Sequence, residues 1–240
     1  MSERRIEPLR LSGGPTQLSA AVRLPELDPR SRSVAVELRG ASGHLVVKPV
    51  RGADPSVSVV KLRLPRNTPP GTYEGTVLVG DREVPVVANV EPQPDLRFLS
   101  TGLVARAGPA AKVDADVTVA NVGNITINIE AKHTFCLFDG SGIHPALFAV
   151  LTEEKPAGEE RINRLLDKIA DLHGGLVRLV VKEGAGDIAP GEVRELRVAL
   201  RFPERLQAGR SYSGAWSVST GSYSVQIEVT EASNPKEETK

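Results

Sequence analysis

The chain repeats one of its own segments. Residues 62–90 combine a strand that ends in proline, a turn rich in proline and glycine, and two further alternating runs, and most of this pattern returns at residues 200–229. The matched residues are Pro65 with Pro203, Gly71 with Gly209, Tyr73 with Tyr212 and Gly75 with Gly214. The last two pairs are spaced one residue wider than the first two, as a single insertion in the turn would produce. Self-similarity that keeps turn residues and apolar alternation predicts a duplicated β-module.

Length and charge limit the classes of function. A chain of 240 residues suits two domains, each able to bury its own core. Lys plus Arg equals Asp plus Glu at 30 each, so no global field attracts nucleic acid, and we expect no nucleic-acid partner. No apolar run approaches the length of a membrane span. Residues 1–10 lack the apolar core of a signal peptide, which predicts cytoplasmic residence and leaves particle association, or export by another route, open.

Short runs of alternating apolar residues, separated by turns, are typical of an antiparallel β-sandwich. In the first half these runs cover residues 18–24, 34–38, 45–47, 60–64, 73–79 and 83–90. The last two are joined by Gly80 and Asp81, which predicts a hairpin. The two prolines within residues 91–95 predict an extended linker. We therefore predict one sandwich over residues 1–92 and a second over 93–232, followed by a disordered tail at 233–240.

The second module departs from the first. Alternation over residues 113–119, a turn at 121–124 and a return over 125–129 predict a hairpin. Apolar residues at helical spacing then predict an amphipathic helix over residues 159–173, inside an insertion that covers about 140–175. We expect the apolar stripe of this helix to pack on its own domain rather than to face a partner. Insertions on a rigid sandwich commonly carry partner contacts, and the candidate contact residues are Glu160, Arg164 and Lys168.

A family resemblance rests on two of these runs. Residues 70–77, which follow a strand that ends in proline, resemble the penultimate strand of bacterial immunoglobulin-like and fibronectin-type-III-like modules, and residues 117–124 resemble an early strand. The resemblance implies an all-β fold of two tandem immunoglobulin-like antiparallel β-sandwiches, the second with the α-helical insertion. It also implies a tyrosine corner, which gives Tyr73 and Tyr212 a structural role. The family's buried cysteine pair has no counterpart, because Cys136 is the only cysteine.

Three further residues receive structural roles. Gly71 and Gly209 are expected to supply backbone freedom in the repeated turn. Trp216, the only tryptophan, could stack on a sugar or lie in a core. The repeat places Trp216 on the same strand face as Tyr212 and Val218, which favours the core.

Candidate chemistry is weak. His133, Cys136 and His144 come nearest to a zinc site, which needs four converging ligands, but residues three apart in a strand point to opposite faces. A buried thiol and a surface histidine are the favoured interpretation. Ser141 lacks the glycine two residues to either side that a hydrolase elbow requires. Residues 184–191 are predicted to form a loop, and residues 184–187 within it lack the lysine of a phosphate loop. We therefore predict no catalytic, cofactor-binding or metal-binding residue.

These observations predict a non-enzymatic structural or protein-interaction protein that contributes to an assembly. Its partners would be other proteins, with homo-oligomerisation left open. The alternative is a carbohydrate-binding or accessory module of a secreted system, although sugar sites usually use exposed aromatic side chains and this chain has few. An enzyme acting through His133, Cys136 and His144 is the third hypothesis.

Overall fold

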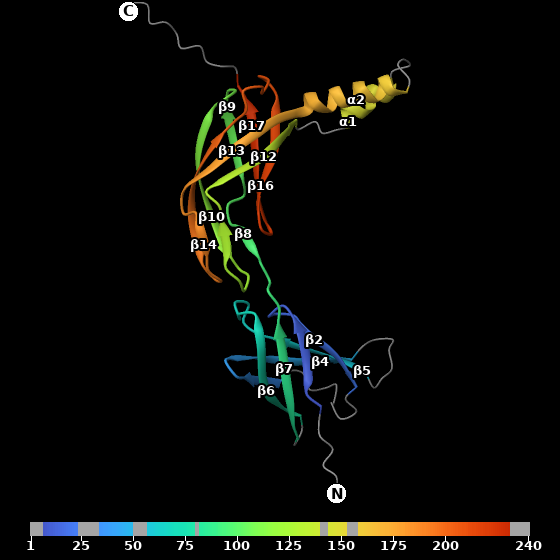
Figure 1. Ribbon diagram of the computed structural model, residues 1–240, viewed down its shortest axis with the longest axis vertical. Helices are drawn as coiled ribbons and strands as arrows, with labels where there is room; N and C mark the ends of the chain where they lie inside the picture. Colours follow the sequence, from blue (N-terminus) through green and yellow to red (C-terminus); the bar gives the residue numbers. More distant parts are fainter. Residues whose placement is uncertain are drawn as a thin grey trace, which may run out of the picture. The chain divides into compact units, whose positions relative to one another are not determined.

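The computed structural model describes residues 7–23, 34–49, 57–79, 82–139, 144–152 and 158–230. The chain divides into two compact units. Unit 1 comprises Met1–Asp95, Asn121–Ile127 and Ala189–Glu192, and unit 2 comprises Leu96–Ala120, Asn128–Ile188 and Val193–Lys240. Both units are built mainly of strands (Figure 1). The predicted tail at 233–240 and Ser141 lie outside the described residues.

Unit 1 is an immunoglobulin-like sandwich whose two layers are joined into one ladder. Its strands are β1 (Leu9–Gly13), β2 (Leu18–Arg23), β3 (Val34–Leu38), β4 (Ala41–Pro49), β5 (Val57–Arg63), β6 (Gly71–Val79) and β7 (Arg82–Val90). The hydrogen-bonded order is β1-β2-β5-β4-β3-β6-β7. β7 also pairs in parallel with β1, which closes the ladder and leaves no free edge in this set of strands.

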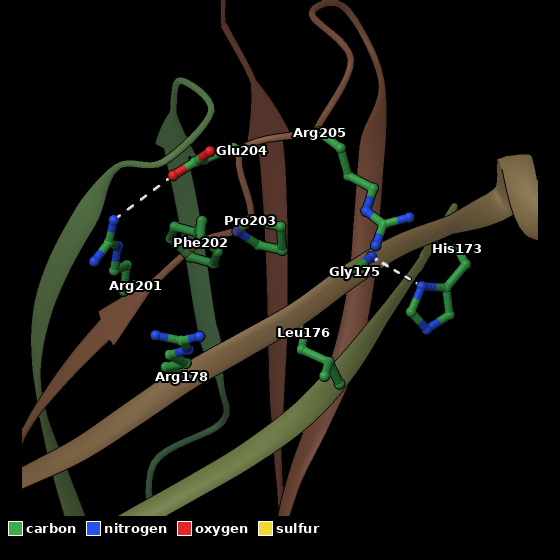
Figure 2. Close-up of a pocket in the computed structure, with 9 residues that line it drawn as sticks. All are labelled: His173, Gly175, Leu176, Arg178, Arg201, Phe202, Pro203, Glu204 and Arg205. Carbon is green, nitrogen blue, oxygen red and sulfur yellow. Dashed lines mark hydrogen bonds and ion pairs between the residues drawn. The ribbon is translucent and has the colours of Figure 1, made fainter.

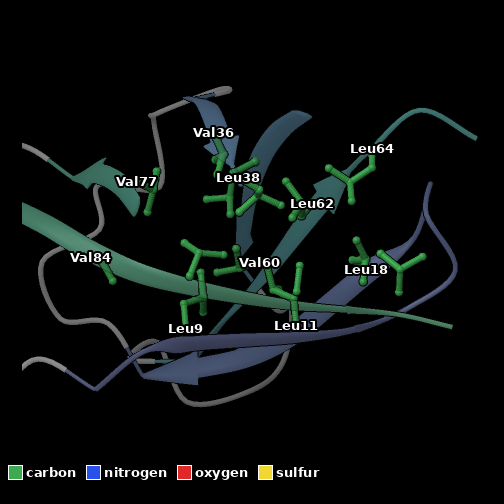
Figure 3. Packing of buried hydrophobic residues seen from close by; sticks show 14 residues of the cluster. Leu9, Leu11, Leu18, Val36, Leu38, Val60, Leu62, Leu64, Val77 and Val84 are labelled. Atoms are coloured by element: carbon green, nitrogen blue, oxygen red, sulfur yellow. The ribbon is translucent and has the colours of Figure 1, made fainter. Parts of the chain in front are cut away.

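The core of unit 1 follows from the strand alternation. Because successive side chains point to opposite sides of a strand, one apolar set from each strand faces inward. Leu11, Leu18, Val60 and Leu62 are fully buried in this aliphatic cluster (Figure 3). At roughly 1.5–3 kcal/mol for each large aliphatic side chain, such burial is the main force that holds the layers together.

Unit 2 repeats this strand order. Its strands are β8 (Leu96–Phe98), β9 (Leu103–Ala107), β10 (Lys112–Asn121), β12 (Lys132–Asp139), β13 (His173–Glu183), β15 (Val193–Arg201), β16 (Ser211–Val218) and β17 (Gly221–Val229), with a separate two-stranded sheet of β11 (Ile127–Ile129) and β14 (Gly186–Ile188). The order is β8-β10-β15-β13-β12-β16-β17-β9. Two strands share the role of β1, because β8 pairs with β10 while β9 pairs in parallel with β17.

The β6–β7 and β16–β17 hairpins have the same register. Tyr73 pairs with Ala88, and Tyr212 pairs with Ile227 at the equivalent position of the second hairpin. The predicted hairpin of unit 1 is confirmed, since β6 and β7 pair along their whole length. The duplicated pattern in the sequence therefore corresponds to a duplicated structural unit.

Two local predictions are wrong. Residues 113–119 and 125–129 do not form a hairpin, because β10 pairs with β8 and β15, whereas β11 pairs with β14. The turn between them is held by side-chain amides. Asn121 Nδ2 donates to the carbonyl of Ile125 at 2.8 Å, and this allows the chain to leave β10 without pairing back on it. The loop predicted over residues 184–191 contains the strand β14.

A helical hairpin separates β12 from β13. It consists of α1 (His144–Thr152) and α2 (Glu159–Leu172). In unit 1 the equivalent strands β3 and β4 are joined by a tight turn, next to the pair Leu38 and Ala41. The predicted helix over 159–173 is confirmed as α2, and the second module carries the insertion at one defined strand connection. Figure 1 shows α1 and α2 side by side, extending away from the strands of unit 2.

Candidate functional site

The two predicted corner tyrosines both bond to the backbone of the preceding loop. The hydroxyl of Tyr73 donates to the carbonyl of Pro69 at 2.8 Å. The hydroxyl of Tyr212 instead accepts from the backbone N–H of Gln207 at 3.4 Å. Tyr212 is almost completely buried, whereas Tyr73 is half-buried. Both hydroxyls therefore bond to the loop that precedes the strand of their own tyrosine.

The turn glycines lie at the start of the same hairpins. Gly71 has a φ of 153° and pairs with Val90. Gly209 has a φ of 78°, and its N–H donates to the carbonyl of Val229 at 2.8 Å. Both angles favour glycine over residues with a side chain. Both glycines therefore lie where the chain enters the first strand of its hairpin.

Trp216 lies in the core of unit 2, with 1% of its surface exposed. Its ring centroid lies 5.2 Å from that of Phe98, in an edge-on arrangement, and 5.2 Å from that of His133. Its indole N–H has no hydrogen-bond partner among the described residues. Because the ring is enclosed, Trp216 is not available to stack on a sugar.

Two of the predicted metal candidates, His133 and Cys136, do not converge. His133 faces inward against Trp216, and its Nε2 lies 2.8 Å from the carbonyl of Glu130. Cys136 is half-buried on the opposite side of β12, while His144 is the first residue of α1. Within the described part of the chain, no group of three or more His, Cys, Asp or Glu side chains is placed to hold a metal ion.

The helical hairpin carries a cluster of exposed apolar side chains, which we call the apolar face. It consists of Phe148 and Leu151 on α1 and of Ile162 and Leu166 on α2. Each of the four is between 58% and 70% exposed. On a monomeric surface single exposed apolar side chains are common, but a cluster of large ones is unusual and marks a contact surface. The expectation that the stripe of α2 packs on its own domain is therefore wrong for these residues.

Helical geometry explains why these four residues share one side. α1 packs on α2, and the more enclosed residues of each helix, such as Val150 and Leu165, form the seam between them. In two antiparallel helices, positions turned by about 100° in the same sense from the seam point to the same side of the pair. Measured from Val150 and Leu165, residues 151 and 166 are turned by about 100°, residue 162 by about 60° and residue 148 by about 160°, all in the same sense.

The predicted partner contacts lie on the other side of α2. Glu160, Arg164 and Lys168 follow each other at intervals of four, which places them about half a turn from Ile162 and Leu166. Arg164 Nη2 lies 3.2 Å from Glu160 Oε1, in an exposed ion pair within the helix. This side of α2 is therefore an ordinary solvated helix surface. Helical periodicity identified the apolar stripe of α2 in the sequence, but it did not show that the stripe is exposed.

A charged surface covers the outer side of β10, β15 and β13, and most of its charges are matched. Lys182 Nζ lies 2.8 Å from Asp114 Oδ1. Arg197 lies 3.2 Å from Glu183 and 3.5 Å from Asp116. The carboxylates of Glu183 and then Asp116 raise the pKa of the Arg197 guanidinium above its ordinary value. Along these rows each basic side chain has an acidic neighbour.

The last row of this surface is different, and we call it the basic row. It consists of Lys112 on β10, Arg201 on β15 and Arg178 on β13. Arg201 is the direct cross-strand partner of the other two. The nearest carboxylate that pairs with the row is that of Glu204, 3.7 Å from Arg201 and largely exposed. Three like charges therefore lie side by side with one weak counter-charge among the described residues.

A pocket of about 550 Å³ opens beside the basic row. Its lining includes Arg178, Arg201, Arg205, His173 and the exposed Leu176, and Figure 2 shows these side chains around the start of β13. The pocket lies where α2 joins β13, so it is at the base of the helical hairpin. Among the helices that the structure describes, none is both long and apolar enough to cross a membrane.

Comparisons with known proteins concern the fold. No protein-family model matches the sequence, and no curated protein matches it either. Among solved structures the chain is similar to the I67–I69 fragment of the I-band of titin, with 10% identity over 95% of this chain and 64% of that fragment, and a TM-score of 0.35. It is also similar to domains 4 and 5 of the S-layer protein SbsC, with 16% identity, 88% and 69% coverage and a TM-score of 0.29.

A third similar structure comprises extracellular cadherin domains 1–4 of protocadherin gamma B7, with 13% identity, 94% and 50% coverage and a TM-score of 0.31. At these identities and TM-scores nothing about function follows from the likeness. The class of the protein rests on its own sheet topology. The chain consists of tandem immunoglobulin-like β-sandwich modules, and the second module carries a helical hairpin between two of its strands.

Proposed function

We propose that this chain is a non-enzymatic protein-interaction module that joins an assembly by binding a different protein through its helical hairpin. The observation that carries the proposal is the apolar face, four large side chains that remain between 58% and 70% exposed. Helices obtain most of their stability from packing an amphipathic face, so a helix pair with an uncovered face is a surface built for a partner.

The charge at the base of the hairpin favours a different protein over a second copy. A twofold contact brings the same patch of both copies together. Two hairpins paired in this way would match their apolar faces, but the second copy would supply another basic row rather than a counter-charge for the first. A partner with apolar and acidic side chains complements both parts, and like charges across an interface act against self-pairing.

A photo-crosslinking residue tests this proposal when it is placed at Leu166 of the full chain in the cells that produce it. We expect crosslinks to one heterologous protein, identified by mass spectrometry, from position 166 and not from position 168 on the other side of α2. The purified partner should then bind the wild-type chain. Crosslinks from Lys168 alone, or a product consisting of two copies of this chain, would overturn the proposal.

Matched variants of the hairpin complete the test. The variant Phe148→Ser, Ile162→Ser, Leu166→Ser removes three of the four side chains of the apolar face, and the control Glu160→Ser, Arg164→Ser, Lys168→Ser makes the same number of serine substitutions on the solvated face. Because both sets are exposed, we expect both variants to keep the circular dichroism of the wild type. Only the apolar variant should lose binding of the purified partner, and equal loss in both variants would contradict the proposal.

A further inference from the structure

Repulsion within the basic row lowers the stability of the folded protein when no ligand is bound. Directly opposed side chains on neighbouring strands interact strongly, and like charges in such positions are destabilising. Arg201 stands opposite a basic residue on each side, Lys112 on β10 and Arg178 on β13. Within the described residues, neither Lys112 nor Arg178 has an ion-pair partner.

The neighbouring rows of the same surface provide an internal comparison. Four residues away from Arg201 along β15, Arg197 stands between Asp116 on β10 and Glu183 on β13, and each of the two carboxylates is its direct cross-strand partner. The same strands therefore pair opposite charges where no ligand is needed. The absence of this matching in the basic row is local, and it coincides with the mouth of a pocket that a third arginine, Arg205, also lines.

We propose that the basic row and its pocket bind an acidic peptide segment of the partner protein. Guanidinium groups present paired N–H donors that match a carboxylate in a bidentate arrangement. Three adjacent strands place the outer two residues of the row about 10 Å apart, and an extended peptide places alternate side chains about 7 Å apart on one side. The long basic side chains can reach carboxylates at this spacing from both ends of the row.

The lining of the pocket favours a peptide over a polyanionic glycan or a nucleic acid. Leu176 is 57% exposed among the basic side chains and offers a contact for an apolar residue. The phenyl ring of Phe202 also lines the pocket, but it is only 2% exposed and is not free to stack on a sugar or a base. Mixed acidic and apolar chemistry is what an acidic peptide segment provides.

This inference rests on the proposed function, since it names the chemistry of the partner, and its test does not use the partner. The probe is a fluorescein-labelled ten-residue peptide of alternating glutamate and leucine, titrated with the full chain and followed by fluorescence polarisation. Its matched probe has glutamine in place of glutamate. Inorganic phosphate and heparin serve as competitors that distinguish a simple oxyanion site and a glycan site.

We expect the glutamate peptide to bind and the glutamine peptide to bind at least about ten-fold more weakly, because charge-assisted hydrogen bonds are the stronger class. The variant Arg178→Gln with Arg201→Gln should weaken binding by about ten-fold or more. The control Arg197→Gln, which alters a matched row of the same surface, should leave it within about two-fold. The serine variant of the apolar face should bind the probe as the wild type does. The peptide assay therefore tests the basic row independently of whether the hairpin binds a partner.

A second measurement does not depend on the choice of peptide. In the absence of ligand and at low salt, Arg178→Gln should keep or raise the melting temperature because it relieves repulsion in the row. Arg197→Gln should lower it because two carboxylates lose their partner. Tighter binding of heparin than of the glutamate peptide would overturn the assignment to a peptide. Equal binding of both peptides, or a lower melting temperature for Arg178→Gln, would overturn the proposal that the basic row is a binding site.

Discussion

Tyr73 and Tyr212 occupy equivalent positions in the two modules, but their hydroxyls play opposite roles in hydrogen bonding. The first donates to a carbonyl, and the second accepts from a backbone N–H. They also differ in enclosure, because Tyr212 is 2% exposed and its ring packs against the backbone of Gly174 at the start of β13. The helical insertion thus leads into a strand that covers the tyrosine of its own module.

This difference predicts unequal effects of truncation. Tyr212→Ala should lower the unfolding free energy of unit 2 by about 3–5 kcal/mol, the usual range for removal of a buried aromatic side chain. Tyr73→Ala should lower that of unit 1 by roughly half as much, since its ring is half-buried. Native-state hydrogen exchange reports the two units separately and is the measurement of choice. A larger effect at Tyr73 would contradict the assignment.

Gly75 and Gly214 predict a shared steric requirement. A Cβ at Gly75 would collide with the carbonyl of Glu37 on β3, and one at Gly214 would collide with the carbonyl of Cys136 on β12. Gly75→Ala and Gly214→Ala should therefore each lower the unfolding free energy by about 1–3 kcal/mol, as overpacking does. Ser213→Ala, a change at the exposed neighbour of Gly214, is the control and should stay within about 0.5 kcal/mol. Denaturant titration of the three variants checks this, and a neutral Gly214→Ala would contradict it.

Local signals in the sequence were sufficient for the β6–β7 hairpin, the helix α2 and the duplication, but not for the hairpin expected over residues 113–129. Alternation and turn residues act between neighbours in the chain, so the register of Tyr73 and Tyr212 in their hairpins can be anticipated. The short strand β1 was not predicted, because its alternation is brief. α1 was not predicted either, since its apolar residues lack a clear polar face.

Long-range pairing determined the rest. The basic row joins Lys112, Arg178 and Arg201, which are far apart in the sequence and become neighbours only through the pairing of β10, β15 and β13. No local pattern marks them. The apolar stripe of α2 was visible in the sequence, but whether Ile162 and Leu166 are covered depends on the direction in which the hairpin leaves β12 and β13. That direction is a property of the folded unit.

Asn124 predicts a strong dependence of unit 1 on one side chain. Its Nδ2 donates to the carbonyl of Glu91 at 3.0 Å, and its Oδ1 accepts from the N–H of Gln93 at 2.6 Å. Since Asn124 is 2% exposed, its removal leaves backbone groups without partners. Asn124→Ala should lower the unfolding free energy by roughly 2–3 kcal/mol. Asn128→Ala, which removes one exposed hydrogen bond to Asp187, is the control and should have a much smaller effect in the same denaturant titration.

Tyr223 predicts a loss of stability at alkaline pH. It is buried across the strands from Trp216, and its ring lies 5.5 Å from that of Phe98. Burial disfavours the phenolate and raises the pKa of Tyr223 above its ordinary value. Below about pH 10 both the folded and the unfolded chain keep this proton, so the contribution is constant there. Above that pH the unfolded chain loses the proton first, and stability falls until the folded pKa is passed.

Tyr223→Phe removes this titration and keeps the ring. The unfolding free energy of the wild type should therefore fall more steeply than that of the variant as the pH rises above about 10, measured by urea titration at constant ionic strength. At pH 8 the two proteins should show no difference in pH dependence, because Tyr223 is ionised in neither the folded nor the unfolded chain there. A parallel decline of both curves through the alkaline range would show that the phenol of Tyr223 is not the group responsible. A difference confined to that range identifies the buried strand pair Trp216 and Tyr223 as the alkali-sensitive part of unit 2.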